Sequence, residues 1–179
     1  MKEVERTQYL GERERGKDSP DIVKVILGVR RAGKSVVMDQ YMRRMIEAGT
    51  DPKDILFMDF ESSDHDDIKD HGDLNTYIAE RIPRNRRTYI FLDEVQRVEG
   101  WERTVNSLMV DYDADIYITG SNAYLLSSEL STYLSGRYVE IKVFPFSFAE
   151  FLEGHPALPD ADRNFRFQQY LRTGGIPLT

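Results

Sequence analysis

Apolar runs and amphipathic stretches alternate along most of the chain. The apolar runs are rich in β-branched and aromatic residues, which predicts buried strands, and the stretches between them have helical spacing. Because strands and helices alternate, we expect an α/β fold with a central parallel sheet. Strands are predicted at 22–27, 54–60, 88–93 and 115–122, with a turn and a fifth strand over 134–143, and helices at 36–45, 74–82, 101–110 and 162–172.

A glycine-rich loop joins the first strand to the first helix. Residues 28–35 read GVRRAGKS and match the phosphate-binding pattern G-x-x-x-x-G-K-[ST] at every fixed position. Gly28 and Gly33 let the backbone turn tightly, so that successive N–H groups point at phosphate oxygens. Lys34 is expected to reach the β- and γ-phosphates, and the Ser35 hydroxyl to bind Mg²⁺. The alternative, a chance match on a strand–turn–helix corner, is disfavoured by the flanking elements.

The rest of the loop and the start of the following helix complete the expected binding set. The unpaired N–H groups and the positive dipole end of that helix face the same anion as the loop. The residues predicted to bind nucleotide are Gly28, Arg30, Arg31, Ala32, Gly33, Lys34, Ser35, Val36 and, from the fourth strand, Ser121.

Two carboxylates end the third predicted strand. Four apolar residues, 89–92, run directly into Asp93 and Glu94. Acids at the carboxyl end of a buried parallel strand lie at the edge where open α/β sheets bind ligands. Asp93 is expected to complete the Mg²⁺ shell, and Glu94 to orient and deprotonate the attacking water. The alternative is a strand end that simply leads into solvent.

Small polar residues end the fourth strand, and an arginine precedes the fifth. Thr119, Ser121 or Asn122 could hydrogen-bond the γ-phosphate or the lytic water, although Ser and Asn also cap helices. Arg137 is a candidate arginine finger, acting in its own site or in a neighbour's, with an ordinary surface ion pair as the competing interpretation. The predicted catalytic residues are therefore Lys34, Glu94, Asn122 and Arg137.

Three other stretches carry weaker signals. Arg6 and Tyr9 could stack on an adenine ring, but a frayed amphipathic helix explains them equally well. Acidic residues and two histidines fill 61–73, where a solvated loop is a better explanation than a metal site. An arginine-rich stretch, 81–87, is the basic patch that could contact nucleic acid.

Composition narrows the class of protein. The 179 residues carry 24 basic and 31 acidic side chains, a net charge of −7 that weighs against a broad duplex-binding face. The absence of cysteine fits a reducing compartment, and the charged N-terminus has no apolar signal core. No apolar run approaches the roughly 20 residues that span a bilayer. We therefore expect a cytoplasmic protein with no membrane contact.

Taken in order, these motifs resemble those of the AAA-like P-loop ATPases of archaea and bacteria, whose ATPase domain precedes a C-terminal domain of unknown function. The resemblance covers most of the chain and is far more specific than the phosphate loop alone. The matching stretches are 28–35, FLDEVQ at 91–96 with Trp101, ITGSN at 118–122, LSGRY at 134–138, FPFSFAEF at 144–151 and GGIP at 174–177.

The resemblance implies a three-layer P-loop sandwich with strand order 5-1-4-3-2 and a Mg²⁺-dependent ATPase activity. In the family pattern Ser121 and Asn122 stand at the sensor position, and Arg137 matches the Gly-Arg of the next strand. We expect an N-terminal extension at 1–19, the AAA-like ATPase domain at 20–153 and the start of a truncated C-terminal helical region at 154–179.

ATP and Mg²⁺ are thus the expected cofactors, and hydrolysis to ADP and phosphate is the expected reaction. One alternative is a regulatory switch that holds ATP with little turnover alone. Another is a DNA-handling ATPase, against which the acidic net charge weighs. A kinase is disfavoured because the Asp93–Glu94 pair suits water activation. ATP and ADP are the expected binding partners, a homo-oligomer is an open alternative, and no protein partner is indicated.

Overall fold

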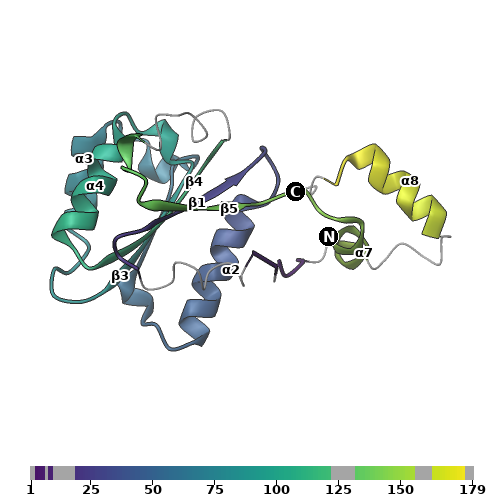
Figure 1. Cartoon of the computed structure of the whole chain (residues 1–179), viewed down its shortest axis with the longest axis horizontal. Coiled ribbons are helices and arrows are strands. Elements are labelled where there is room, and N and C mark those ends of the chain that lie inside the picture. Colours follow the sequence, from purple (N-terminus) through teal and green to yellow (C-terminus); the bar gives the residue numbers. More distant parts are fainter. Residues whose placement is uncertain (1–2, 7, 10–18, 122–131, 156–162, 176–179) are drawn as a thin grey trace.

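A single five-stranded sheet forms the centre of the molecule (Figure 1). The computed structural model describes residues 3–6, 8–9, 19–121, 132–155 and 163–175. The sheet order is β2-β3-β4-β1-β5, and each pair of neighbours is parallel. This is the expected order 5-1-4-3-2 read from the other edge, so the fold prediction is confirmed. The strands are β1 (Val23–Gly28), β2 (Ile55–Asp59), β3 (Thr88–Asp93), β4 (Ala114–Ser121) and β5 (Tyr138–Lys142).

Helices cover both faces of this sheet, which gives three layers (Figure 1). Residues that alternate along β1 face opposite layers: Val25 and Leu27 pack with α3 and α4, whereas Ile26 packs with α2. The covering helices are α2 (Lys34–Glu47) on one face and α3 (His71–Ala79) and α4 (Trp101–Asp111) on the other. Two further helices, α7 (Phe148–Gly154) and α8 (Arg163–Thr173), lie beyond β5 and away from the sheet (Figure 1). Single 3₁₀ turns are η2 (Pro52–Asp54), η3 (Ser63–His65) and η4 (Val95–Arg97).

The parallel arrangement brings the carboxyl ends of the strands to one edge of the sheet. Asp59 at the end of β2 pairs in register with Asp93 at the end of β3, and Gly28 pairs with Ser121. The loop that follows Gly28 therefore lies at the same edge as both aspartates. The amino ends of the strands lie at the opposite edge of the sheet, away from this loop.

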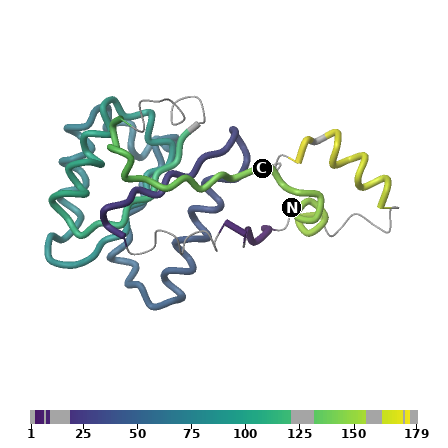
Figure 2. The backbone as a smooth tube through the Cα atoms, viewed as in Figure 1, coloured from purple at the N-terminus to yellow at the C-terminus, as the bar shows by residue number. Residues whose placement is uncertain are grey.

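The terminal segments meet beyond the edge strand β5. Figure 2 shows the N-terminal segment beside the stretch that leads from β5 to α7. Val4, Arg6 and Tyr9 are buried, so the described part of the N-terminal segment packs into the domain. Among the described residues, no helix is long and apolar enough to cross a membrane, and the cytoplasmic location stays a prediction.

A buried ion pair joins β1 to β4 inside the sheet. The Lys24 ammonium contacts the Asp115 carboxylate, and the two side chains are 2% and 0% exposed. Removing one partner leaves a buried charge that is poorly compensated, which costs about 3–5 kcal/mol. Asp115→Asn is therefore expected to lower the free energy of unfolding in urea by about 3 kcal/mol.

The matched control for this variant lies two residues earlier. Asp113 pairs with Arg87 at 2.9 Å, and its side chain is 49% exposed. An exposed pair of this kind contributes at most about 1 kcal/mol, so Asp113→Asn should change the stability little. Equal losses in the two variants would show that burial does not set the cost.

Candidate nucleotide-phosphate site

The start of α2 is open toward the loop that precedes it. Gly33 precedes Lys34 with φ 93°, a left-handed conformation that favours glycine. No side chain among the described residues caps α2, and its first turn has no acidic residue. The first N–H groups of α2 are therefore left for an anion.

Gly28 is required by the packing of the neighbouring chain. A Cβ atom at Gly28 would lie 2.6 Å from the carbonyl oxygen of Val143, just after β5. Any side chain there would push β1 and this extension of β5 apart. The first glycine of the motif thus sets the close approach of two backbones as well as the turn of the loop.

A cavity of about 570 Å³ opens at the loop. Its lining has four cationic side chains and two carboxylates, so it is locally basic in a chain whose net charge is −7. This balance suits a polyphosphate. Gly28 and Ala32 of the predicted binding set are not in the lining. The lining residues are Arg30, Arg31, Gly33, Lys34, Ser35, Val36, Glu61, Glu94, Gln96 and Arg97.

Lys34 and Glu94 form an ion pair across this cavity. The Lys34 Nζ atom lies 3.2 Å from Glu94 Oε1 and 3.4 Å from the carbonyl oxygen of Gly28. The other Glu94 oxygen accepts a hydrogen bond from the Gln96 amide. Glu94 itself has φ 54°, so a strained residue turns the chain from β3 into η4. The predicted phosphate-binding lysine and the predicted base thus face each other.

Asp93 lies deeper, at the end of β3, and is 3% exposed. Burial raises the pKa of the Asp93 carboxyl above its usual value, and the nearby Asp59 and Glu94 carboxylates act in the same direction. Hydrogen bonds from Ser35 and Thr119 oppose this effect on the pKa. Ser35 and Asp93 therefore place two hard oxygen donors together, a set that fits Mg²⁺.

The raised pKa of Asp93 predicts how stability depends on pH. A raised pKa means that the ionised carboxylate destabilises the folded chain, so stability is lost as the pH rises through that pKa. Asp93→Asn should therefore stabilise the metal-free and nucleotide-free chain at pH 7. The gain should vanish below about pH 3, where Asp93 is protonated in both the folded and the unfolded state. Urea unfolding across this pH range measures it, and a gain that grows toward low pH would contradict the prediction.

The Thr119 hydroxyl ties β3 to β4 beneath the cavity. It donates a hydrogen bond to Asp93 and accepts one from the backbone N–H of Glu94 at 2.9 Å. A threonine hydroxyl has one proton to donate, and here Asp93 takes it. The Thr119 hydroxyl thus orients both acidic residues in this arrangement. The contact with the γ-phosphate or the lytic water, expected of Thr119, Ser121 or Asn122, stays a prediction.

The other predicted site residues are Ser121, Asn122 and Arg137. Ser121 ends β4 beside Gly28, at the edge that carries the loop. Asn122 lies outside the described residues. Arg137 precedes β5, and its carbonyl accepts a hydrogen bond from the N–H of Val23 at the start of β1. It is thus at the opposite edge, where its guanidinium donates to Asn106 at 3.3 Å. A catalytic role for Arg137 would require the site of a neighbouring molecule.

Two of the weaker sequence signals have structural explanations. Arg6 is 1% exposed, and its guanidinium lies 4.8 Å from the ring centre of Tyr9, so it stacks inside the protein and is not placed to stack on an adenine ring. In the acidic 61–73 stretch, His65 lies between the rings of Phe60 and Tyr77. No group of three potential metal ligands occurs in the part of the chain that the structure describes.

The arginine-rich stretch, 81–87, lies at the edge of the sheet opposite to the cavity. It precedes β3 and so belongs to the amino edge of the sheet. Arg86 pairs with Asp54 at 2.7 Å, Arg87 with Asp113 and Arg81 with Glu80. These carboxylates neutralise much of the predicted nucleic-acid patch.

No sequence motif identified Glu61 and Arg97, which line the cavity, or Asp59, which lies next to Asp93 in the sheet. Arg97 pairs with Glu61 at 3.0 Å across the two loops that follow β3 and β2. Asp59 adds a second carboxylate beside Asp93. The sequence offers one signal for Asp59, because it ends an apolar strand as Asp93 does.

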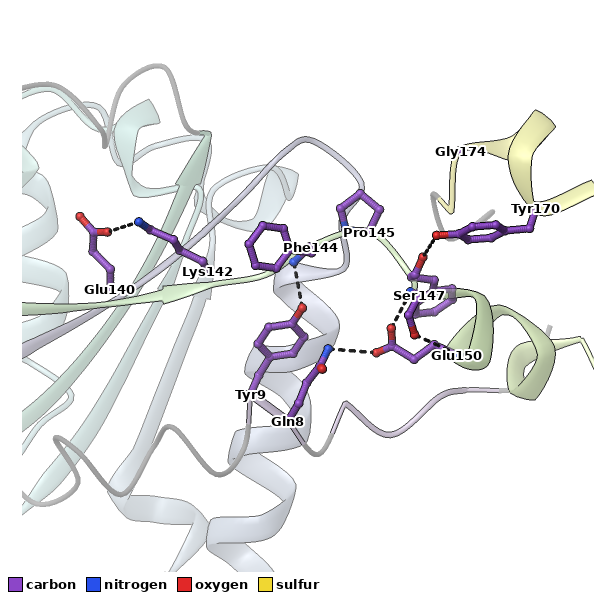
Figure 3. A pocket seen from close by; sticks show the side chains of 11 residues that line it. Gln8, Tyr9, Glu140, Lys142, Phe144, Pro145, Ser147, Glu150, Tyr170 and Gly174 are labelled. Atoms are coloured by element: carbon purple, nitrogen blue, oxygen red, sulfur yellow. Dashed lines mark hydrogen bonds and ion pairs between the residues drawn. The ribbon is translucent and has the colours of Figure 1, made fainter. Parts of the chain in front are cut away.

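A second cavity, of about 900 Å³, lies between β5, the N-terminal segment and the C-terminal helices (Figure 3). Tyr9, Phe144 and Tyr170 contribute aromatic side chains to it. Figure 3 shows Glu150 between Gln8 and Ser147, with dashed contacts to both. Of the predicted phosphate-binding and catalytic residues that the structure describes, none lines this cavity.

Comparison with known proteins decides the family. The sequence model of the AAA domain family matches residues 21–152. The chain belongs to the AAA domain family. It is therefore a nucleotide-binding, ATPase-type domain of the AAA-like P-loop class, as the motifs predicted.

Relatives and solved structures agree with this assignment. An uncharacterised protein of Haemophilus influenzae is 44% identical over 178 residues, covering 97% of this AAA domain chain and 44% of that protein. An uncharacterised protein of Methanocaldococcus jannaschii is 29% identical over 166 residues, covering 88% and 36%. The chain thus spans less than half the length of these two relatives.

The structural likenesses show the fold alone, because sequence identity is low. Cdc6p from Pyrobaculum aerophilum superposes with a TM-score of 0.55 at 14% identity, covering 86% of this chain and 49% of that one. Hsp104 of Saccharomyces cerevisiae, from its complex with casein, gives 0.57 at 15% identity, covering 96% and 31%. A DNA polymerase III gamma subunit-related protein from Thermotoga maritima gives 0.54 at 15%, covering 92% and 57%.

Proposed function

We propose that this AAA domain is a Mg²⁺-dependent ATPase that hydrolyses ATP to ADP and phosphate. One observation carries the proposal: a single basic cavity has Lys34 and Ser35 at the start of α2 on one side and Glu94 after β3 on the other. A phosphate-binding element and a candidate base thus line the same space. Catalysis of phosphoryl transfer depends mostly on such positioning and on charge stabilisation.

Phosphate binding would replace the ion pair between Lys34 and Glu94. Lys34 would exchange the Glu94 carboxylate for the β- and γ-phosphate oxygens, which keeps its buried ammonium paired. Glu94 would then be released to accept a proton from the attacking water. Arg30 and Arg31, both exposed at the cavity, would add positive charge around the phosphates.

Ser35 and Asp93 are the residues that would hold Mg²⁺. When bound, the ion would neutralise charge on the β- and γ-phosphates. Thr119 would keep Asp93 oriented toward Ser35 through its hydrogen bond to the carboxylate. Ser121 would contact the γ-phosphate side from the end of β4, and Asn122 keeps the sensor role that the sequence predicts.

Phosphate release from ATP tests the proposal. The wild-type chain should release phosphate with Mg²⁺ and stop when EDTA removes the ion. ATP binding without release would favour the regulatory switch. The switch has one structural argument in its favour: Lys34 and Gln96 both hold the Glu94 carboxylate, and these contacts compete with the activation of water.

The partners follow from the same placement. An exposed Arg137 at the amino edge would act only in a neighbouring subunit, so its catalytic role rests on a homo-oligomer. DNA handling has little support here, since the arginine-rich stretch is paired with acids and lies at the edge away from the cavity. We also propose that residues 154–179, which include α8, belong to a C-terminal helical region distinct from the ATPase domain at 20–153.

A further inference from the structure

A buried arginine contacts the phosphate loop from behind. Arg6 belongs to the N-terminal segment and is 1% exposed. Its Nη1 donates a hydrogen bond of 2.7 Å to the carbonyl oxygen of Ala32, the residue before Gly33 in the loop. Ala32 is fully buried, whereas Gly33 lines the phosphate cavity.

This contact fixes the direction of one peptide group of the loop. In a planar trans peptide, the carbonyl of one residue and the N–H of the next point in opposite directions. Holding the Ala32 carbonyl toward Arg6 therefore aims the Gly33 N–H the other way, toward the cavity. We propose that Arg6 is a positioning residue that presets the Gly33 N–H for a phosphate oxygen. This inference rests on the proposed nucleotide site.

The guanidinium is itself held from three other directions. Its Nη2 donates to the carbonyl of Phe144 at 2.7 Å and to the Tyr9 hydroxyl at 3.3 Å. Its Nε pairs with Glu150 Oε1 at 3.0 Å. The Arg6 backbone N–H donates a hydrogen bond of 3.0 Å to the side-chain oxygen of Gln40 in α2. Arg6 is thereby fixed in one orientation.

The same carboxylate also begins the helix α7. Glu150 Oε2 accepts a hydrogen bond from the Ser147 N–H at 2.7 Å, and the Ser147 hydroxyl accepts one from the Glu150 N–H, which forms a capping box. Figure 3 shows Glu150 in this position, between Ser147 and the N-terminal segment. The contacts that orient the Arg6 side chain therefore depend on α7 being in place.

A lysine cannot replace this arginine. The acceptors lie on separate elements and match the planar, five-donor fork of a guanidinium, whereas an ammonium is a single point with three donors. Arg6→Lys keeps the charge and removes the fork. It should lose the Ala32 contact while retaining the ion pair with Glu150.

The test follows the Gly33 amide by glycine-selective ¹⁵N labelling of the chain during titration with Mg·ADP. In the wild type, the Gly33 amide proton should shift downfield as it binds phosphate. In Arg6→Lys this shift should be lost, and the affinity for Mg·ADP should fall at least about tenfold, the size of a lost hydrogen bond to a charged group. Glu150→Gln weakens the contacts that orient Arg6 but keeps Arg6 itself. It should therefore give smaller losses of the Gly33 shift and of the affinity for Mg·ADP.

Arg44→Lys is the matched control, because it makes the same change at an arginine of α2 that is 37% exposed and pairs with Glu5 of the N-terminal segment. It should retain the Gly33 shift. A retained shift in Arg6→Lys, or equal losses in Arg6→Lys and Arg44→Lys, would overturn the role of Arg6 while leaving the nucleotide site intact. No Mg·ADP binding by the wild type would overturn the proposed function and this inference together.

Discussion

Lys34→Ala is expected to lower the affinity of the chain for ATP by about a hundredfold or more. The ammonium lies at the cavity and is the group that would pair with the β- and γ-phosphates. Its loss also leaves Glu94 in the cavity without its cationic partner, which adds repulsion toward the phosphates. Equilibrium titration with a fluorescent ATP analogue measures the change.

Lys53→Ala is the control for this variant. Lys53 is exposed and precedes β2, so it lies at the amino edge of the sheet. Lys53→Ala therefore removes the same charge as Lys34→Ala, but far from the cavity. It should bind ATP as the wild type does. Equal affinity in Lys34→Ala and the wild type would remove the phosphate loop from nucleotide binding.

Glu94→Gln is expected to bind ATP and to release phosphate about 10²–10⁴-fold more slowly than the wild type, the usual contribution of a general base. The amide keeps the shape and hydrogen-bonding reach of the side chain but takes up no proton. Because it also removes a negative charge from the cavity, ATP affinity should be retained or increased. Single-turnover phosphate release at saturating protein separates the two effects.

Glu99→Gln serves as the comparison, since Glu99 is exposed and lies five residues further along the same connection. It should leave turnover unchanged. Undiminished turnover in Glu94→Gln would exclude Glu94 as the base and shift attention to the other carboxylates of this edge, Asp59 and Glu61.

Most of the fold could be predicted because each strand is a short apolar run between breaks. The ends of the helices were harder to predict where a single capping side chain determines them. The helix predicted from residue 74 begins at His71, because the Asp70 side chain accepts hydrogen bonds from the N–H groups of Gly72 and Asp73. A glycine and two polar residues hid this start in the sequence.

The core of the candidate site could also be predicted, since parallel strands bring the residues after their carboxyl ends together. The same rule explains the place of Arg137. It precedes its strand, whereas Asp93 ends one, so the two lie at opposite edges. Contacts such as Arg6 with Ala32 join segments 26 residues apart and depend on packing that no local pattern encodes.

The central claim is that the loop at 28–35 binds the phosphates of a nucleotide. Competition binding of ATP, ADP, adenosine and inorganic pyrophosphate to the wild-type chain, with Mg²⁺ present, tests it most directly. ATP and ADP should bind, pyrophosphate should displace them, and adenosine should bind far more weakly because it has no phosphate. Adenosine binding as tightly as ATP, with no displacement by pyrophosphate, would contradict the claim.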